Sequence, residues 1–264
     1  MPRAWPVFVA VGVLIVVAFS GTLVVAAPLT QATGHIGGVQ ARGIQAATAL
    51  TSTNWAGYAA TAAAGKVTKV SGAWVEPAAK CTSQLRLAAF WVGIDGFSSS
   101  TVEQVGTIMQ CYGGAATYGA WWEMYPANAL QLISTITVHA GDHFSASVTH
   151  SSAGFKMSIK DITTGVSFSV TANQVGTARS SAECIVEAPA GDSTTSGLYP
   201  LANFGTLKFS SCTATIGGVS AGIGTFSPLY AITMVSYPSG AHDLATVSAL
   251  TSNKAFHVTW KHAT

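Results

Sequence analysis

Charged residues are scarce in this sequence. Only 8% of its 264 residues are Asp, Glu, Lys or Arg, and ten are Asp or Glu, whereas soluble domains usually have about a quarter charged residues. Hydrophobic residues make up 49%, which excludes the composition of a disordered chain. The net charge of +2 gives no indication of a nucleic-acid partner. We therefore expect a folded domain with an uncharged polar surface that tolerates acid, because few carboxylates are there to be protonated.

Several catalytic and metal-binding motifs are absent. The sequence contains no H-E-x-x-H, no P-loop and no dinucleotide-binding glycine fingerprint. It has no C-x-x-C and no Cys/His cluster with the spacing of a zinc site, so neither a metal nor an organic cofactor is predicted. The G-V-S-A-G at 218–222 precedes Asp243 and His257 in the chain order of an α/β-hydrolase triad. No helical pattern follows it, so we interpret this segment as a loop.

The N-terminal segment, residues 1–27, is an apolar run that follows Arg3 and ends in V-V-A-A-P. It predicts a secretory signal peptide cleaved near Ala26 or Ala27, although an uncleaved membrane anchor is the alternative, since about 20 apolar residues span a bilayer. Residues 28–50 lack periodicity and are interpreted as a linker or a short pro-segment. Both alternatives place residues 51–264 outside the cytoplasm. We therefore expect the four cysteines to form disulfides. Four cysteines allow three pairings, and the sequence pattern does not choose among them.

From Thr51 onward, short runs rich in Val, Ile, Thr and aromatic residues alternate with Gly, Ser, Pro and Asp clusters. No segment keeps a helical period over three turns. This pattern predicts an all-β domain, an antiparallel sandwich or barrel. The expected strands include K-V-S-G-A-W-V (69–75), A-A-F-W-V-G-I (88–94), Y-G-A-W-W-E-M-Y (118–125), S-T-I-T-V-H (134–139), H-F-S-A-S-V-T (143–149), F-K-M-S-I-K (155–160), V-S-F-S-V-T (166–171), E-C-I-V-E (183–187), T-L-K-F-S-S-C-T-A-T (206–215), Y-A-I-T-M-V (230–235) and A-F-H-V-T-W (255–260).

Two of these strands carry carboxylates in apolar or aromatic surroundings. In S-A-E-C-I-V-E-A-P (181–189), the two-residue period of a strand places Glu183 and Glu187 on one face. In A-W-W-E-M-Y (120–125), Glu123 shares a face with Trp121 and Tyr125. A carboxylate between aromatic rings suits a binding cleft, and an exposed Glu on an aromatic strand is the alternative.

These carboxylates are compatible with more than one chemistry. Glu123 and Glu187 could be the acid and the nucleophile or base of a glycoside hydrolase with a Trp-lined jelly-roll cleft. A non-catalytic carbohydrate-binding sandwich would have similar composition. An acid protease needs instead a carboxylate to activate water and a donor to stabilise an oxyanion. A side-chain amide donates without titrating, and Gln104 in E-Q-V-G-T (103–107) is such an amide.

The order of seven sequence blocks resembles the glutamic peptidases, or eqolisins, over residues 51–260. The resemblance implies a jelly-roll or concanavalin-like sandwich of two antiparallel seven-stranded sheets. It also implies an acid-active endopeptidase, which we expect to be secreted and monomeric and to act on polypeptides without a cofactor, a nucleic acid or, for the mature domain, a membrane. The blocks are N-W-A-G-Y (54–58), G-A-W-V-E-P (72–77), F-W-V-G-I-D-G (90–96), E-Q-V-G-T (103–107), A-W-W-E-M-Y-P (120–126), S-A-E-C-I-V-E-A-P (181–189) and F-G-T-L-K-F-S (204–210).

The same resemblance assigns roles to individual residues. It implies a catalytic dyad in which Glu187 is the general base and acid and Gln104 stabilises the oxyanion. Asp95 and Glu123 are expected to tune Glu187 and hold the amide, while Glu183 is expected to be structural or solvated. The substrate-binding residues that it implies are Trp91, Asp95, Glu123 and Tyr125.

Two cysteines depart from the family pattern. Cys184 stands where the family usually has Trp, and Cys212 stands where a small residue is expected. Because they fall on neighbouring expected strands, we hypothesise a Cys184–Cys212 disulfide, which leaves Cys81 to pair with Cys111.

Overall fold

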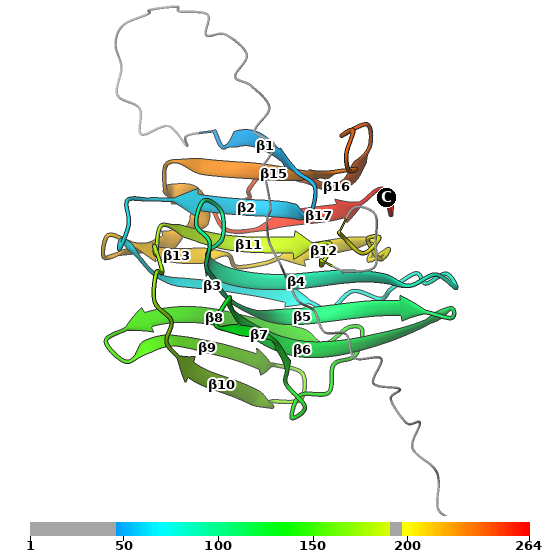
Figure 1. The fold of residues 1–264 in the computed structure, drawn as a ribbon, viewed down its shortest axis with the longest axis horizontal. Coiled ribbons are helices and arrows are strands. Elements are labelled where there is room, and N and C mark those ends of the chain that lie inside the picture. Colours follow the sequence, from blue (N-terminus) through cyan, green and yellow to red (C-terminus); the bar gives the residue numbers. More distant parts are fainter. Residues whose placement is uncertain (1–45, 191–196) are drawn as a thin grey trace, which may run out of the picture.

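The computed structural model describes residues 46–190 and 197–264, and within them nearly all regular structure is β-strand (Figure 1). The expected leader and most of the expected linker lie outside the described residues, and the first strand begins at Thr48, three residues before the expected domain start. The elements are β1 (Thr48–Ser52), β2 (Trp55–Thr61), β3 (Val67–Val75), β4 (Arg86–Asp95), β5 (Val102–Tyr112), β6 (Ala115–Tyr125), β7 (Asn128–Leu132), β8 (His143–Ser151), β9 (Gly154–Asp161), β10 (Ser167–Ala172), β11 (Ser181–Glu187), β12 (Thr206–Phe209), β13 (Thr213–Ile216), β14 (Val219–Gly222), the 3₁₀ turn η1 (Ile223–Thr225), β15 (Leu229–Val235), β16 (Asp243–Val247) and β17 (Phe256–Trp260).

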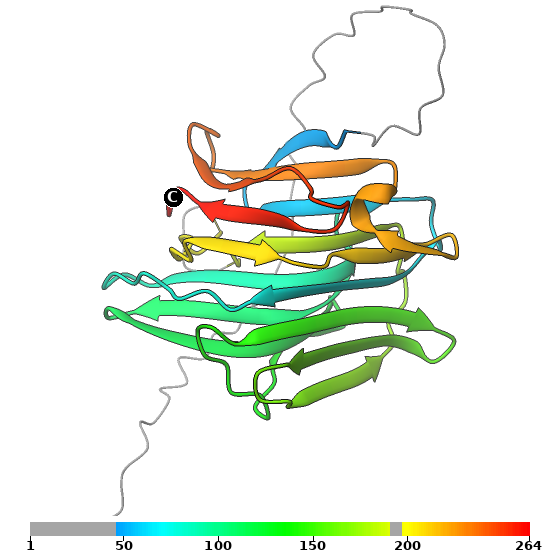
Figure 2. The same cartoon turned by 180° about the vertical axis from the view of Figure 1, so that it is seen from behind.

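The strands form two stacked layers, which the two opposite views separate (Figures 1 and 2). The first layer runs β1-β15-β2-β11-β4-β5-β6-β7. The second runs β16-β17-β12-β3-β8-β9-β10, with the β13–β14 hairpin also paired along β3. Every described ladder between strands is antiparallel except β1–β15. The antiparallel sandwich is therefore confirmed. The expected count of two seven-stranded sheets is not, because β15 also pairs with β16 and joins the layers into one folded sheet.

Strand alternation divides each layer into an inner and an outer face. On β11, Ala182, Cys184 and Val186 belong to the apolar core between the layers. Since successive side chains point to opposite faces, Glu183 and Glu187 lie on the outer face of the first layer, as the sequence predicts. The inner faces supply a core of large aromatic and aliphatic side chains, so the sandwich has a firmly packed interior.

The four cysteines form two disulfides, Cys81–Cys111 and Cys184–Cys212, which are the two hypothesised pairings. Cys184 lies on β11 of the first layer, and Cys212 lies directly before β13 of the second. Both are fully buried in the core between the layers. This bond therefore ties the layers together directly behind the outer-face carboxylates of β11.

Three of the expected elements differ in the structure. The segment S-T-I-T-V-H (134–139) is not a strand: its buried Ile136 and Val138 lie in an irregular segment that turns back after Ile133. The long run at 206–215 is divided into β12 and β13, because Ser210 to Cys212 leave the ladder. The expected loop G-V-S-A-G is instead strand β14, and the Ser220 hydroxyl pairs with that of Thr215 at 2.8 Å, so it forms no nucleophile elbow.

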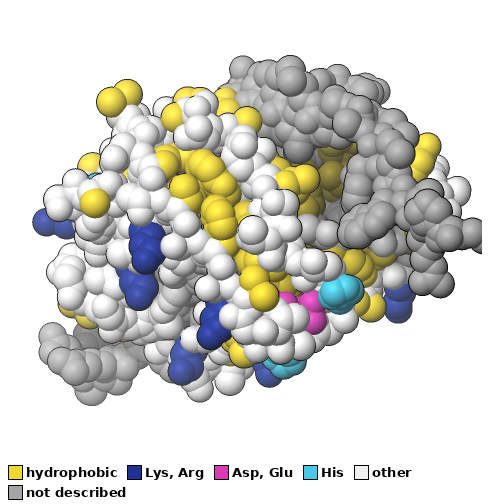
Figure 3. All heavy atoms as spheres, turned by 90° about the horizontal axis from the view of Figure 1, so that it is seen from below, with side chains coloured by type: hydrophobic (Ala, Val, Ile, Leu, Met, Phe, Trp, Pro, Cys, Tyr) yellow, Lys and Arg dark blue, Asp and Glu magenta, His cyan; other side chains and the backbone are white. Residues whose placement is uncertain are grey.

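Most acidic side chains are inside the molecule. Of the nine Asp and Glu within 46–190 and 197–264, eight are buried: Glu76, Asp95, Glu103, Glu123, Asp142, Asp161, Glu183 and Glu187. The described residues contain one ion pair, between His139 and Asp142. Consistently, Lys and Arg outnumber Asp and Glu on the face that Figure 3 shows, among mostly uncharged side chains. No helix in the described part of the chain is long and apolar enough to cross a membrane.

Candidate active site

A buried amide–carboxyl pair lies on the outer face of the first layer. Gln104 of β5 is directly opposite Glu123 of β6 in the antiparallel ladder. Its Nε2 donates a hydrogen bond of 2.5 Å to Glu123 Oε2. Each of the two side chains is only 5% exposed. The pairing follows from the register, because side chains directly opposite on one face of an antiparallel pair are near neighbours.

Glu187, at the end of β11, is the second carboxyl group on this face. The Trp91 indole Nε1 donates to Glu187 Oε2 at 2.8 Å, and Asn54 Nδ2 donates to Oε1 at 3.3 Å. Trp55 lies opposite Glu187 in the ladder and packs edge-on against Trp91, with ring centroids 5.1 Å apart. Glu187 is 8% exposed. The carboxyl group of Glu187 therefore accepts hydrogen bonds from two side chains and is flanked by the indole rings of Trp55 and Trp91.

Two glycines make room for the Trp91 ring. A Cβ on Gly106 would lie 2.0 Å from the Phe90 carbonyl oxygen and 2.7 Å from Trp91 Cβ. A Cβ on Gly93, which is opposite Gln104, would lie 2.7 Å from the indole ring. Any larger residue would displace the ring that donates to Glu187. This explains the glycines of W-V-G and Q-V-G in the sequence blocks.

Burial favours the protonated forms of both carboxyl groups. The pKa of Glu187 is raised to about 8: burial is the largest cause and the charge of Glu123 adds to it, while hydrogen bonds from Trp91 and Asn54 oppose the shift. The pKa of Glu123 is raised to about 7, again mainly by burial, against the lowering effect of the Gln104 amide. Because Glu123 acts on Glu187 through its charge, the two carboxyl groups form one coupled system.

The structure thus connects four of the residues expected in the site: Gln104 bonds to Glu123, Glu123 acts electrostatically on Glu187, and Glu187 bonds to Trp91. Asp95 has other partners. Its carboxylate accepts hydrogen bonds from the backbone N–H groups of Arg179 and Ser180, at 2.6 and 2.9 Å. Asp95 therefore fixes the segment that leads into β11, and no hydrogen bond joins it to Gln104 or Glu187 in the described structure.

Tyr125 lies at the end of β6, two residues after Glu123, and is half-buried. Its carbonyl oxygen accepts a hydrogen bond of 2.8 Å from Gln174 Nε2, which also contacts Glu103. The same amide accepts from the backbone N–H of Ala127 at 3.3 Å. Gln174 consequently holds the turn after β6 beside the proposed site.

Glu183 is not solvated, and this corrects one of its two expected roles. It is fully buried on the same face as Glu187, and neither of its carboxyl oxygens satisfies hydrogen-bond geometry with a partner. Burial raises its pKa well above the ordinary value, and the nearby Asp95 and Glu103 raise it further. Complete burial of the side chain agrees with the structural role.

Sequence reasoning missed two groups of contact residues. Asn54 and Trp55 lie against Glu187, and they begin the block N-W-A-G-Y that the resemblance includes, so a signal for them was present. Gln174 lies outside every block, and no pattern in the sequence marks it.

Comparisons with known proteins agree with this fold. The family model described as the peptidase A4 family matches residues 53–260. Aspergillopepsin-2 of Aspergillus niger is 35% identical over 150 residues, which are 54% of this chain and 51% of that protein. This chain therefore spans about half the length of that curated relative.

Solved structures show the same fold. Scytalido-glutamic peptidase, solved with a transition state analog inhibitor, matches with a TM-score of 0.67 and 25% identity over 79% of this chain and 98% of that chain. Aspergilloglutamic peptidase from Aspergillus niger matches with a TM-score of 0.56 and 29% identity over 67% of this chain and 99% of that chain. Taken with the family model, which spans almost the whole described sandwich, these similarities identify the fold and its lineage: the chain belongs to the peptidase A4 family.

Proposed function

We propose that the protein is a secreted endopeptidase that hydrolyses polypeptides in acid with a Gln104–Glu187 dyad. The observation that carries the proposal is the linked set on one outer face, where Gln104, Glu123, Glu187 and Trp91 are connected by hydrogen bonds and charge. Family membership supports the peptidase activity. The two disulfides support an extracellular location.

Glu187 is the group that moves protons. In its ionised form it takes a proton from a water molecule held between it and Gln104, and the water oxygen attacks the scissile carbonyl carbon. The same proton then passes from Glu187 to the leaving amine nitrogen as the C–N bond breaks, which returns Glu187 to its ionised form. The step needs no cofactor, because the water supplies both the hydroxyl of the new acid and the proton of the new amine.

Protonation of Glu123 in acid lowers the pKa of Glu187 and so makes its ionised form more accessible than it is beside a charged Glu123. Part of its raised pKa comes from the charge on Glu123, and this part disappears once Glu123 is protonated, below its pKa of about 7. Water entering the site also solvates the carboxylate, and the Trp91 and Asn54 donors stabilise it. A histidine base would be protonated and inactive under the same conditions.

Gln104 stabilises the negative charge that develops on the carbonyl oxygen. An amide nitrogen has two N–H groups, and Glu123 accepts from one of them. The other remains for the oxyanion. Glu123 therefore acts as a positioning residue that fixes the amide, and a neutral amide remains a donor at any pH at which the protein is active.

Hydrolysis of a denatured protein substrate from pH 2 to pH 8 tests the proposal. We expect activity confined to acid, and a decrease of about 10²- to 10⁴-fold in the Glu187→Gln variant, the range that positioned acid–base groups contribute. Activity centred at neutral pH, or acid activity retained by this variant, would contradict the dyad.

Glu183→Gln is the matched control. Glu183 lies on the same strand and the same face and is equally buried, but it forms no bond with Gln104 or Glu187. The raised pKa of Glu183 keeps its carboxyl group protonated at pH 4, so replacing it by a neutral amide does not change the charge. We therefore expect the Glu183→Gln variant to keep its activity at pH 4. Equal loss in both variants would indicate that β11 tolerates no substitution, and it would remove the support for Glu187 as the reacting group.

A further inference from the structure

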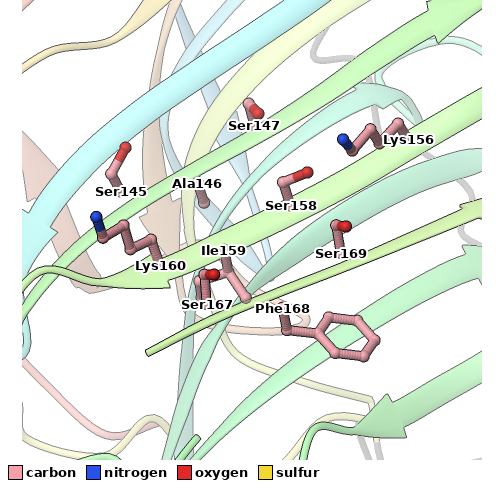
Figure 4. Close-up of a pocket in the computed structure, with 10 residues that line it drawn as sticks. All are labelled: Ser145, Ala146, Ser147, Lys156, Ser158, Ile159, Lys160, Ser167, Phe168 and Ser169. Carbon is pink, nitrogen blue, oxygen red and sulfur yellow. The ribbon is translucent and has the colours of Figure 1, made fainter. Parts of the chain in front are cut away.

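We propose that the outer face of the second layer, formed by β3, β8, β9 and β10, binds acidic polysaccharides. This face is remote from the proposed active site, because the outer faces of the two layers point in opposite directions (Figures 1 and 2). It contains a shallow hollow of about 370 Å³ over β8, β9 and β10, with Lys156 and Lys160 on its rim (Figure 4).

Hydroxyl groups form a regular row across the hollow. Ser147, Ser158 and Ser169 are directly opposite one another on three neighbouring strands. Ser71 of β3 continues the row beyond the hollow, where its hydroxyl pairs with that of Thr213 at 2.7 Å. Neighbouring strands are about 4.8 Å apart, so the row presents hydroxyls at a spacing that suits a hydroxyl-rich polymer lying across the strands. The small side chains create the hollow, since nothing larger than serine fills the centre of this row.

Lysines flank the serine row on both sides. On one side of the serine row, Lys160 is opposite Ser145. On the other side, Lys69 and Lys156 are both opposite Thr149, one from each neighbouring strand. Lys156 and Lys160 are four residues apart on β9, which corresponds to about 13 Å. All three lysines are exposed, and none forms an ion pair in the part of the chain that the structure describes. The hollow therefore combines three unpaired positive charges with a lattice of hydroxyls.

The charge distribution of the molecule favours an anionic partner. Eight of its carboxyl groups are buried, so almost no negative charge on the described surface competes for these lysines. Within this face, the outward positions of β8, β9 and β10 are Ser, Thr, His or Lys. Asp161, which directly follows Lys160 on β9, is buried, so an anion approaching the lysines meets no exposed carboxylate on these strands.

Side-chain chemistry favours a polysaccharide over other polyanions. A single-stranded nucleic acid would need aromatic rings on which bases stack, and the aromatic residue beside the hollow, Phe168, packs against the core. A membrane surface would need apolar side chains that insert, and the outward positions of these strands carry none. Hydroxyls and ammonium groups together match sugar hydroxyls with sulfate or carboxylate groups.

Retention on immobilised polymers tests the proposal. We compare dextran sulfate, polygalacturonate and neutral dextran at low ionic strength, with the wild-type chain and the variant Lys69→Gln/Lys156→Gln/Lys160→Gln. The variant should bind dextran sulfate roughly 10- to 100-fold more weakly at pH 4. Dextran sulfate stays charged in acid, so wild-type binding should persist at pH 3, whereas binding to polygalacturonate should weaken there as its carboxylates are protonated.

The matched control removes the same charge elsewhere. Lys80, Lys254 and Lys261 are exposed and lie outside the four strands of this face. Their triple replacement by Gln should change the affinity less than about twofold. Equal weakening by the two triple variants, retention on neutral dextran equal to that on the charged polymers, or tighter binding to single-stranded RNA than to dextran sulfate would each overturn the proposal.

Discussion

The outer faces of the two antiparallel layers differ in burial: the first is covered by side chains and the second is open to solvent. On the first layer, every residue of β11 is buried, including its two glutamates. On the second, β10 alternates between exposed and half-buried residues along its whole length. Large aromatic side chains cover the first face, whereas serines and lysines leave the second open to solvent.

This difference decides what the acidic and basic groups can do. A carboxyl group under aromatic rings loses its solvation, so its pKa rises and its protonation can be coupled to that of a neighbour. A lysine on an open strand keeps its solvation and its charge, and it acts only through long-range attraction. The described carboxyl groups are mostly buried, whereas Lys156 and Lys160 lie exposed on β9.

Among the variants that keep Glu187, the largest expected effect comes from removing the buried amide. Gln104→Ala should lower kcat by about 10²- to 10³-fold, because it removes the oxyanion donor while Glu187 remains. The variant should remain folded by circular dichroism, and a glycoside hydrolase that uses Glu123 and Glu187 would be little affected. A substitution on the open face, Ser158→Ala, is the matched control and should leave kcat unchanged. Full peptidase activity in Gln104→Ala would contradict its assigned role.

Raising the pH should destabilise the fold through two of its buried carboxyl groups. The pKa of Glu76 and that of Glu103 are each raised from the ordinary 4.5 to about 8, mainly by burial. Below 4.5 these groups are protonated in the folded and the unfolded chain; between 4.5 and 8 the folded chain binds more protons, so stability falls as pH rises.

Denaturant unfolding at several pH values measures this loss. We expect the free energy of unfolding to fall by more than about 3 kcal/mol between pH 4 and pH 8. Glu76→Gln should make the decline shallower, since it removes one titrating group that accepts only from Thr107. A free energy of unfolding that is constant between pH 4 and pH 8 would contradict the raised pKa values of these carboxyl groups.

Loss of the Cys184–Cys212 disulfide should be the next largest effect on stability. The bond closes a span of 28 residues, for which the loop-entropy relation gives about 3–4 kcal/mol. The double variant Cys184→Ala/Cys212→Ala should unfold at correspondingly lower denaturant concentration. The Cys81–Cys111 bond closes a similar span of 30 residues, so Cys81→Ala/Cys111→Ala is the comparison variant. An unchanged denaturation midpoint in Cys184→Ala/Cys212→Ala would contradict the proposed tie between the layers.

The open face should tolerate substitution best. Lys156→Gln and Lys160→Gln should each change the free energy of unfolding by less than about 0.5 kcal/mol, because these exposed side chains have no ion-pair partner among the described residues. Thermal unfolding at pH 4 measures this. A loss above about 2 kcal/mol would mean that the lysines support the fold and that the two faces differ less than the burial pattern indicates.

The sequence predicts the strands that alternate regularly, and with them the faces that Glu183, Glu187 and Glu123 share. It fails at 134–139, where Ile136 and Val138 alternate with polar residues as in a strand but the backbone is irregular. It also fails where a hydrogen-bond partner comes from a distant segment. Asp95 follows a predicted strand, but its partners Arg179 and Ser180 are more than 80 residues away. Family resemblance names the residues of the site, whereas only the fold indicates which of them touch.

Strand β1 has a consequence for processing. Its five residues pair with Tyr230–Met234 of β15 in the one parallel ladder of the described strands, and they occupy the outer edge of the first layer. A maturation cut upstream of Thr48 leaves this cover in place. A cut beyond Ser52 would uncover a row of backbone N–H and C=O groups on β15, and an uncovered strand edge is a template for pairing with another chain. The position of a maturation cut would therefore decide whether the edge of β15 stays covered or is open to pairing with another chain.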